Sequence, residues 1–175
     1  MATHGIIQGV APHIMAEEEW IILRDVRLAA LHESPQAFLS SHSEELAFEE
    51  QKWRAEFGRG EWTVEIRNDE PIALVGITRE QGTPPDECYL EYMWVSPGFR
   101  RRGVATDLVR AVLRRLVNRG FVTIWLWVLD GNEPARRLYE KCGFTSTGLI
   151  QRPRRSPSRS EELMRLIFRQ RSRLG

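Results

Sequence analysis

The spacing of apolar residues predicts two helices and then a β-hairpin in the first half of the chain. A helical period covers residues 17–33 and a second covers about 44–57, and both stretches begin with acidic residues, which suit the positive end of a helix dipole. Residues 62–68 and 72–78 are rich in branched and aromatic side chains. A turn-forming Asn-Asp-Glu-Pro joins them, so they predict the two strands of a hairpin. The first helical period is carried by Trp20, Leu23, Ala30 and Leu31.

The second half begins with a strand, a helix and another strand. Residues 88–95 are an aromatic and branched run that stops at a Ser-Pro-Gly turn. Residues 104–119 carry one apolar face and one arginine-rich face, which predicts an amphipathic helix. Residues 121–129 are almost wholly apolar, which is the pattern of a strand buried on both faces. Elements in this order predict a right-handed parallel crossover.

The C-terminal part predicts one more helix and two more strands. Residues 133–142 follow Asn132, a suitable N-cap, and have a proline in the first turn and a glycine just past the end. Residues 144–150 and 163–168 have the composition of strands, and the polar loop 152–160 lies between them. The order of the elements predicts an α/β (α+β) fold.

The composition narrows the class of protein without naming a function. A chain of 175 residues is the size of one domain with its own core, so we expect a single domain over 1–175. The 25 basic and 24 acidic side chains nearly cancel, which argues against a nucleic-acid partner. We find no signal-peptide pattern, no apolar run long enough to span a membrane, and only two cysteines, Cys88 and Cys142. We therefore expect a cytoplasmic protein with no membrane partner.

The segment 100–105, Arg-Arg-Arg-Gly-Val-Ala, has the features of a phosphate-binding turn. It lies between a predicted strand and a predicted helix, where free backbone N–H groups and the helix dipole favour an anion. Gly103 permits close approach, and the arginines can add charge-assisted hydrogen bonds. A Walker A loop is excluded because Val104 and Ala105 replace its lysine and its serine or threonine, and no G-x-G-x-x-G occurs. The alternative is a solvated turn with Gly103 as a tight bend.

Two sequence motifs carry a family resemblance. R-x-x-G-x-A at 100–105, after a strand, is followed at 132–144 by a complete N-x-x-A-x-x-L-Y-x-x-x-G-F. In this order they resemble the GNAT superfamily of N-acetyltransferases, closely over 89–147 and more loosely over 20–57. The resemblance implies a GNAT fold, with a mixed twisted sheet of about six to seven strands flanked by about four helices. It also implies acetyl transfer from acetyl-CoA to a primary amine of a small molecule or peptide, by direct attack through a tetrahedral intermediate.

By this resemblance the turn and the strand before it bind acetyl-CoA as a cosubstrate, and no metal is required. Backbone N–H groups of 100–105 would hold the pyrophosphate, and the strand end would pair with the pantetheine arm. A backbone N–H near Met93 would be the oxyanion donor. Asn132 would contact the pantetheine end, a role that is compatible with a simple N-cap. The implied cofactor-binding residues are Met93, Trp94, Val95, Arg100, Arg101, Arg102, Gly103, Val104, Ala105, Thr106, Asn132 and Ala135.

Two side chains are candidates for proton transfer. Tyr139 follows Asn132 by two helical turns and so shares its face, where it would protonate the departing thiolate unless it is only a packing residue. Glu91 is expected on the same strand face as Met93 and would accept the amine proton. A water relay and a structural ion pair are the alternatives, and Tyr89 stands where many relatives carry a glutamate. Neither cysteine has a paired histidine motif, so neither is expected to be a nucleophile.

The sequence leaves several alternatives open. The same fold can serve a non-catalytic CoA-binding sensor or an interaction module, although Tyr139 favours the enzyme. We expect the N-terminal helices and the loop 152–160 to form the acceptor cleft, and this loop is either a solvated connection or a recognition element for an acidic acceptor. Acceptor identity and oligomeric state, including a homodimer, stay undetermined. The arginines of the loop are Arg152, Arg154, Arg155 and Arg159.

Overall fold

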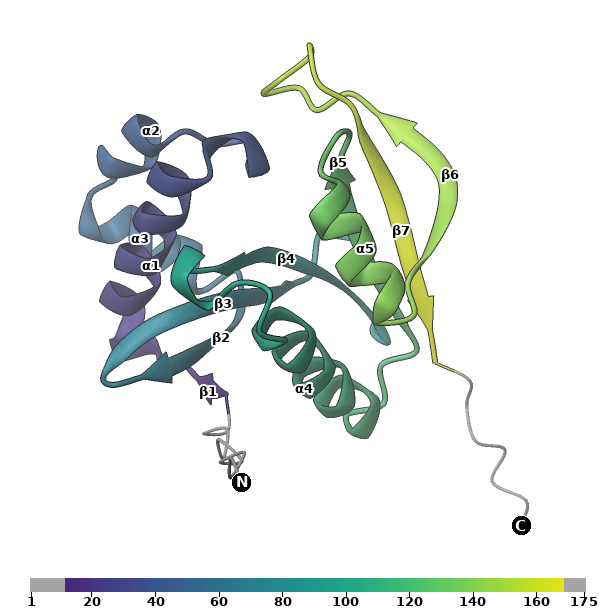
Figure 1. The fold of residues 1–175 in the computed structure, drawn as a ribbon, viewed down its shortest axis with the longest axis horizontal. Coiled ribbons are helices and arrows are strands. Elements are labelled where there is room, and N and C mark those ends of the chain that lie inside the picture. The colour runs from purple at the N-terminus through teal and green to yellow at the C-terminus, as the bar shows by residue number, and fades with distance from the viewer. Residues whose placement is uncertain (1–11, 169–175) are drawn as a thin grey trace, which may run out of the picture.

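A mixed sheet of seven strands forms the framework of residues 12–168, the part of the chain that the structure, a computed structural model, describes (Figure 1). Along the sheet the strand order is β1-β2-β3-β4-β5-β7-β6, in which β4 and β5 run parallel and all other neighbours run antiparallel. The predicted α/β (α+β) fold with a mixed sheet is confirmed. The strands are β1 (His13–Ile14), β2 (Gly60–Arg67), β3 (Glu70–Thr78), β4 (Glu87–Val95), β5 (Thr123–Leu129), β6 (Thr145–Gln151) and β7 (Glu161–Ile167).

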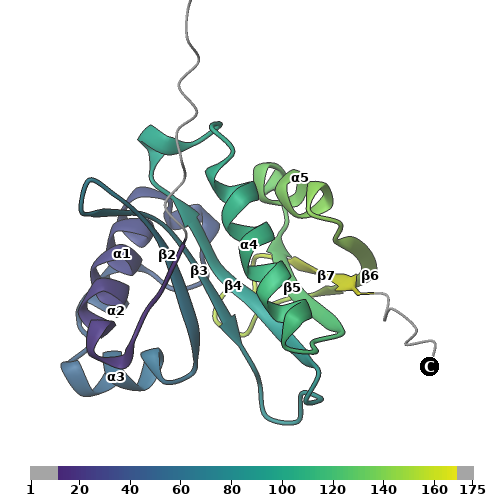
Figure 2. The same ribbon diagram turned by 90° about the horizontal axis from the view of Figure 1, so that it is seen from below.

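Helices cover both faces of this sheet (Figure 2). The α-helices are α1 (Trp20–Glu33), α2 (His42–Leu46), α3 (Glu50–Phe57), α4 (Val104–Asn118) and α5 (Glu133–Lys141). The first three lie on one side of β2, β3 and β4, and the other two lie on the opposite side. No helix within residues 12–168 has both the length and the apolar character needed to cross a bilayer.

The N-terminal region is more broken than the periodicity predicted. The single helix predicted over 44–57 is wrong, because α2 ends at Leu46 and a new helix starts at Glu50. Glu49 is extended between them, and the ring of Phe48 turns inward to contact Trp53 at 5.6 Å between centroids. No proline or glycine lies between the two helices, so the sequence carries no local signal of the break. The short strand β1 and a 3₁₀ turn at Pro35–Ala37 were also not predicted.

Two apolar clusters lie on opposite faces of the sheet. One fills the space under α4 and α5, and the other joins β2, β3 and β4 to α1 and α3 and contains four tryptophans. In the second cluster a Cβ at Gly76 would come within 2.6 Å of the ring of Trp62, so only glycine fits there. Large aromatic side chains contribute most of the buried apolar area in such a cluster. The N-terminal helices are thereby held firmly against the strand that carries the site.

The strands β4 and β5 part after their first three residues (Figure 1). Their parallel pairing joins Glu87–Tyr89 to Thr123–Trp125 and goes no further within the described residues. Beyond this point β4 stays paired with β3, and β5 stays paired with β7. The facing edges of β4 and β5 are therefore left without a strand partner, although both lie inside the molecule.

β4 also contains a β-bulge. The pairs Leu74–Trp94 and Gly76–Glu91 leave two residues of β4 opposite a single residue of β3. The first of the two, Tyr92, has φ of 59°, in the left-handed region. A bulge leaves its extra residue without a ladder partner and redirects the side chains around it.

The bulge overturns one expectation about the site. Glu91 pairs with Gly76 and therefore faces the cluster that contains Trp62, since residues opposite one another in a ladder share a face. Met93 packs against the other cluster, under α4 and α5. The prediction that Glu91 and Met93 share a face is therefore wrong, because alternation along a strand holds only where no residue is inserted.

Candidate active site

A cleft opens where β4 and β5 part. It offers about 470 Å³, within the range of small-molecule sites. Its walls come from β4, β5 and α5, from the segment after α1, and from the hairpin of β6 and β7. The predicted site residues that line it are Glu91, Met93, Asn132, Ala135 and Tyr139. The fold thus brings together the candidate base and the candidate acid, which are almost fifty residues apart in the sequence.

The predicted residues at the end of β4 lie differently. The Trp94 side chain faces α1, and its Nε1 donates to Glu33 Oε2 at 3.2 Å. The Val95 side chain is buried in the opposite cluster. Neither side chain lines the cleft, so the predicted pairing of this strand end with a pantetheine arm would involve backbone groups only, and it stays a prediction.

The turn before α4 presents free backbone donors. Gly103 is the N-cap with φ of 85°, no side chain caps the helix, and Arg101 also has positive φ. The turn and loop hydrogen bonds of the described residues include none donated by the N–H groups of 101–106, and the first such bond joins Asp107 N–H to Gly103 O at 2.9 Å. Consecutive free N–H groups of this kind form an anion-binding concavity. The side chains of Arg101 and Arg102 are exposed beside it.

Arg100 has a different role from the one expected for its side chain. Its Nε donates to Val95 O at 2.8 Å, and its Nη groups bind Glu33 and the Ser34 hydroxyl. Burial alone would raise the pKa of the Glu33 carboxyl, but hydrogen bonds from Ser34, Arg100 and Trp94 outweigh it and hold that pKa below its ordinary value. Arg100 therefore ties the turn to the end of α1, which leaves its backbone rather than its guanidinium for a phosphate.

Asn132 and Tyr139 line the cleft from the N-cap and from the last turns of α5. The Asn132 side chain accepts a hydrogen bond from Ala135 N–H at 3.3 Å, which confirms the N-cap and leaves its contact with CoA a prediction. The Tyr139 ring is only 7% exposed and packs edge-on against Phe144. No hydrogen bond of the described residues involves its hydroxyl, and burial raises its pKa. Tyr139 is therefore a protonated donor whose hydroxyl is available at the cleft.

Glu91 has the environment of a base. Burial is the largest effect on its carboxyl and raises its pKa, and Glu80 adds to the shift. The Thr78 hydroxyl, Arg59 and Arg27 lower the pKa without cancelling that rise. Glu91 takes part in none of the ion pairs of the described residues. A raised carboxyl pKa brings the group closer to neutral pH, where a general base works best.

The thiols differ from these two groups. Burial raises the pKa of Cys88 to about 12 and also raises that of Cys142, so both stay protonated at neutral pH. A protonated, buried thiol is a poor nucleophile. Within residues 12–168, no group of three or more His, Cys, Asp or Glu side chains is arranged to hold a metal ion.

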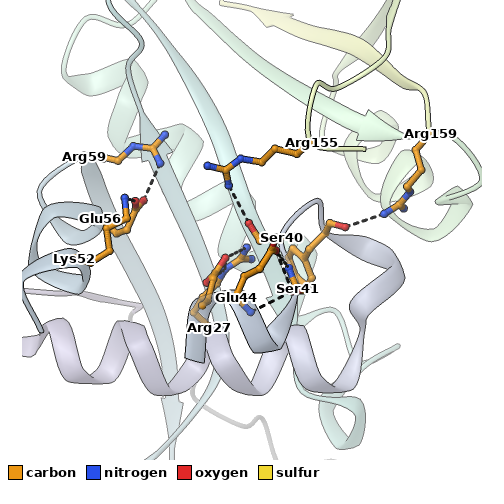
Figure 3. Close-up of polar contacts among 11 residues, drawn as sticks. Arg27, Ser40, Ser41, Glu44, Lys52, Glu56, Arg59, Arg155 and Arg159 are labelled. Carbon is orange, nitrogen blue, oxygen red and sulfur yellow. Dashed lines mark hydrogen bonds and ion pairs between the residues drawn. The ribbon is translucent and has the colours of Figure 1, made fainter. Parts of the chain in front are cut away.

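The arginine-rich loop between β6 and β7 reaches across to the N-terminal helices (Figure 3). Arg159 Nη1 donates to Phe38 O at 2.8 Å, which anchors the loop. Arg155 lines the cleft and donates to the Ser40 hydroxyl at 3.4 Å. Arg152, Arg154 and Arg155 are all exposed, but Arg152 and Arg154 do not line the cleft. The loop is therefore a bridge over one end of the cleft, and its arginines have separate roles.

Several lining residues were not identified from the sequence. The bulge places Tyr92 in the cleft wall, and Trp127 and Arg59 line the cleft because distant segments pack together. Neither periodicity nor a motif marks these residues in the sequence. Arg27 did carry a signal. It lies four residues after Leu23, on the buried stripe of α1, where a charged residue needs special partners.

Comparison with known proteins agrees with this architecture. A model of the Acetyltransferase (GNAT) family matches residues 28–144. The crystal structure of a ribosomal-protein-alanine N-acetyltransferase from Brucella melitensis superposes with a TM-score of 0.71 at 15% identity. It covers 91% of this chain and 100% of the other. At that identity the superposition shows the shared fold alone.

Two curated relatives have different acceptors in their names. The ribosomal protein bS18-alanine N-acetyltransferase of Salmonella typhimurium is 36% identical over 81 residues, which are 46% of this chain and 53% of the relative. The mycothiol acetyltransferase of Brachybacterium faecium is 30% identical over 132 residues, which are 75% of this chain and 38% of the relative. The chain thus spans about half or less of the length of these relatives.

The environment of Glu91 predicts how stability depends on pH. A carboxyl whose pKa is higher in the folded than in the unfolded state opposes folding when it ionises. This cost is absent below the ordinary pKa of a glutamate and grows as pH rises through the folded value. Glu91→Gln removes it, so the variant should gain stability relative to wild type between pH 4 and pH 7. Urea unfolding at both pH values measures the difference, and a relative loss toward pH 7 would contradict the raised pKa.

Proposed function

The chain belongs to the GNAT acetyltransferase family, and from this premise we propose that it is an acyl-CoA N-acyltransferase that moves the acetyl group of acetyl-CoA to a primary amine. One observation carries the proposal. A single cleft holds a half-buried carboxyl with a raised pKa on β4 and a phenol with an uncommitted hydroxyl on α5. Amine acetylation requires a group that accepts a proton and a group that supplies one.

The residues present fit acetyl-CoA as the cosubstrate. The free N–H groups of 101–106 and the exposed Arg101 and Arg102 suit a pyrophosphate. The parted edges of β4 and β5 suit a pantetheine arm, whose amides can pair with backbone groups that lack a strand partner. Asn132 would contact the arm at the start of α5.

Different groups in the cleft would then carry out the separate steps of the reaction. An alkylammonium with a pKa of about 10.4 must lose a proton before it attacks, and Glu91 would take that proton directly or through a water. The backbone N–H of Met93, beside the bulge, would stabilise negative charge on the former carbonyl oxygen. Tyr139 would give its proton to the thiolate as the carbon–sulfur bond breaks.

The alternative is a CoA-binding module of the same fold that senses acetyl-CoA without transferring the acetyl group. The raised pKa of Glu91 favours the enzyme, because burying a carboxyl away from any ion pair has a free-energy cost that a mere binding module does not need. We place the reaction in the cytoplasm, in keeping with the two unpaired cysteines of the chain.

Release of CoA thiol tests the activity. Purified protein is incubated with acetyl-CoA and a panel of polyamines, aminoglycosides, amino acids and peptides, and free thiol is measured against a reaction without acceptor. Acceptor-dependent release is the expected result. Binding of acetyl-CoA without release from any amine would select the sensor instead.

Gly103→Ala tests the phosphate turn against a matched control. Both Gly103 and Gly120 have φ near 85°. A Cβ at Gly103 would make only an ordinary contact with Asp107 Oδ2 at 3.6 Å, and one at Gly120 would meet nothing within 4 Å, so Ala strains the two backbones alike. Gly120→Ala lies at the other end of α4 and should leave CoA affinity unchanged. Gly103→Ala should weaken it by about 10-fold or more, on the scale of one lost charged hydrogen bond. Calorimetry measures both, and equal affinities would remove the turn from the site.

Tyr139→Phe tests the general acid. The substitution keeps the ring against Phe144 and removes only the hydroxyl, which bonds to nothing else among the described residues. We expect kcat to fall by about 10² to 10⁴ with little change in Tm or in CoA affinity. Near wild-type kcat, with chemistry shown to be rate-limiting, would make water the proton donor.

A further inference from the structure

A second, smaller pocket adjoins the cleft at its acceptor end. The two share Arg27, Ser40, Arg59, Tyr92 and Arg155 in their walls, so they are continuous. The smaller one lies among α1, α2 and α3 and offers about 50 Å³, room for only a few non-hydrogen atoms. Any group that enters it must be the end of a molecule rather than a continuing chain.

Arg27 lies at the junction of the two pockets and is held on almost every side. Arg27 is only 5% exposed, and its Nε and Nη2 form a bidentate ion pair with the Glu45 carboxylate at 2.8 to 3.2 Å. The rings of Phe38 and Tyr92 lie over the guanidinium, with their centroids 4.5 Å and 4.4 Å from its carbon. The remaining nitrogen, Nη1, is buried and has no hydrogen-bond partner among the described residues.

An unpartnered guanidinium nitrogen in such a setting has a physical cost. A buried polar group without a partner loses hydration that nothing in the protein restores, and the cost is larger for charged groups. Glu45 and the two rings also prevent the guanidinium from turning to find a partner. An acceptor atom supplied by a ligand in the cleft would satisfy Nη1.

Arg155 adds a second cation to the same place. It reaches in from the β6–β7 loop, and its one hydrogen bond among the described residues is the long contact to the Ser40 hydroxyl. Figure 3 shows Arg59 and Arg155 extending from opposite sides into the space beside Arg27. Arg59 already donates to Glu56 at 2.8 Å, whereas Arg155 forms no ion pair in the described part of the chain. Of these arginines, Arg155 therefore has the most hydrogen-bond donors left for a ligand.

Positive and negative side chains gather at different ends of the cleft. The smaller pocket is lined by four cations and by two carboxylates, Glu45 and Glu56, each of which already binds a cation. Glu91, together with Glu80 and Glu161, lines only the larger cleft. A ligand with an amine at one end and an anion at the other would match this arrangement.

We propose that the acceptor is a small amine that also carries a carboxylate, an amino acid or a close derivative, held by Arg27 Nη1 and Arg155 while its amine lies at Glu91. The assignment rests on the proposed function. A carboxylate fits better than a phosphate, because the carboxylates of Glu45 and Glu56 would repel a second negative charge. A small molecule fits better than a polypeptide, because the contacts of Arg155 with Ser40 and of Arg159 with Phe38 O bridge this end of the cleft.

Paired acceptors test the proposal. Free amino acids and their carboxamides differ only in the anionic group, and CoA thiol release gives kcat/KM for each. We expect the carboxylate form to be favoured by about 10- to 100-fold, the range of a hydrogen bond to a charged group. In Arg155→Ala this preference should shrink toward unity while KM for acetyl-CoA stays the same. Arg154→Ala, the exposed neighbour, should behave like wild type. Equal preference in wild type and Arg155→Ala would overturn the proposal.

A binding measurement separates this proposal from the activity itself. Butyrate carries a single anionic group and no amine, and calorimetry follows its binding without any catalysis. It should bind wild type and Arg154→Ala alike and bind Arg155→Ala about 10-fold more weakly. Arg27→Lys, which keeps a cation beside Glu45 and removes Nη1, should also weaken it, with Tm as the check on folding. Wild-type affinity in both variants, or a preference for inorganic phosphate, refutes the carboxylate site. Butyrate binding that depends on Arg155 in a protein that acetylates no amine refutes only the activity.

Discussion

The parting of β4 from β5 is the constraint on which the rest of the structure depends. Beyond Tyr89 and Trp125 these neighbours share no hydrogen bonds, yet both strands stay in the sheet through their other edges. Buried backbone N–H and C=O groups need partners, so two open edges inside a protein favour a ligand that can supply them. The extended, amide-bearing arm of CoA is chemically suited to that position. Without the separation, Glu91 on β4 and Tyr139 on α5 could not line one cleft.

Helix α1 connects the turn before α4 with the end of the cleft at Arg27. Glu33, at the end of α1, binds both Arg100 of the phosphate turn and Trp94 of β4. Six residues earlier on the same helix, Arg27 faces the acceptor end. One rigid helix therefore fixes the distance between the two ends of the site, and the buried tryptophans hold that helix against the sheet. Such preorganisation keeps reacting groups in position without an entropic cost at the moment of reaction.

The local features of the site were predictable from the sequence because local rules govern them. The free N–H groups before α4 follow from a strand, a glycine and an amphipathic helix in succession, and the Asn132 cap follows from its place before a proline-containing first turn. Tyr139 shares the Asn132 face because helical spacing fixes it. Glu91 could be placed on the strand but not on its correct face, since the inserted residue at Tyr92 leaves no mark in the pattern of apolar residues.

What the sequence determined by itself was the order and type of most elements, the family, and the residues around the phosphate turn and along α5. Each of these depends on neighbours within one or two turns of the chain. Tertiary structure alone decided which distant groups meet: the break between α2 and α3, the pairing of Arg27 with Glu45, and the reach of Arg155 to Ser40 across more than a hundred residues. These contacts depend on how whole elements pack, because hydrophobic burial is non-directional and specifies a face rather than a partner. The family motifs are therefore readable in the sequence, whereas the side chains that we propose to select the acceptor are brought together only by the fold.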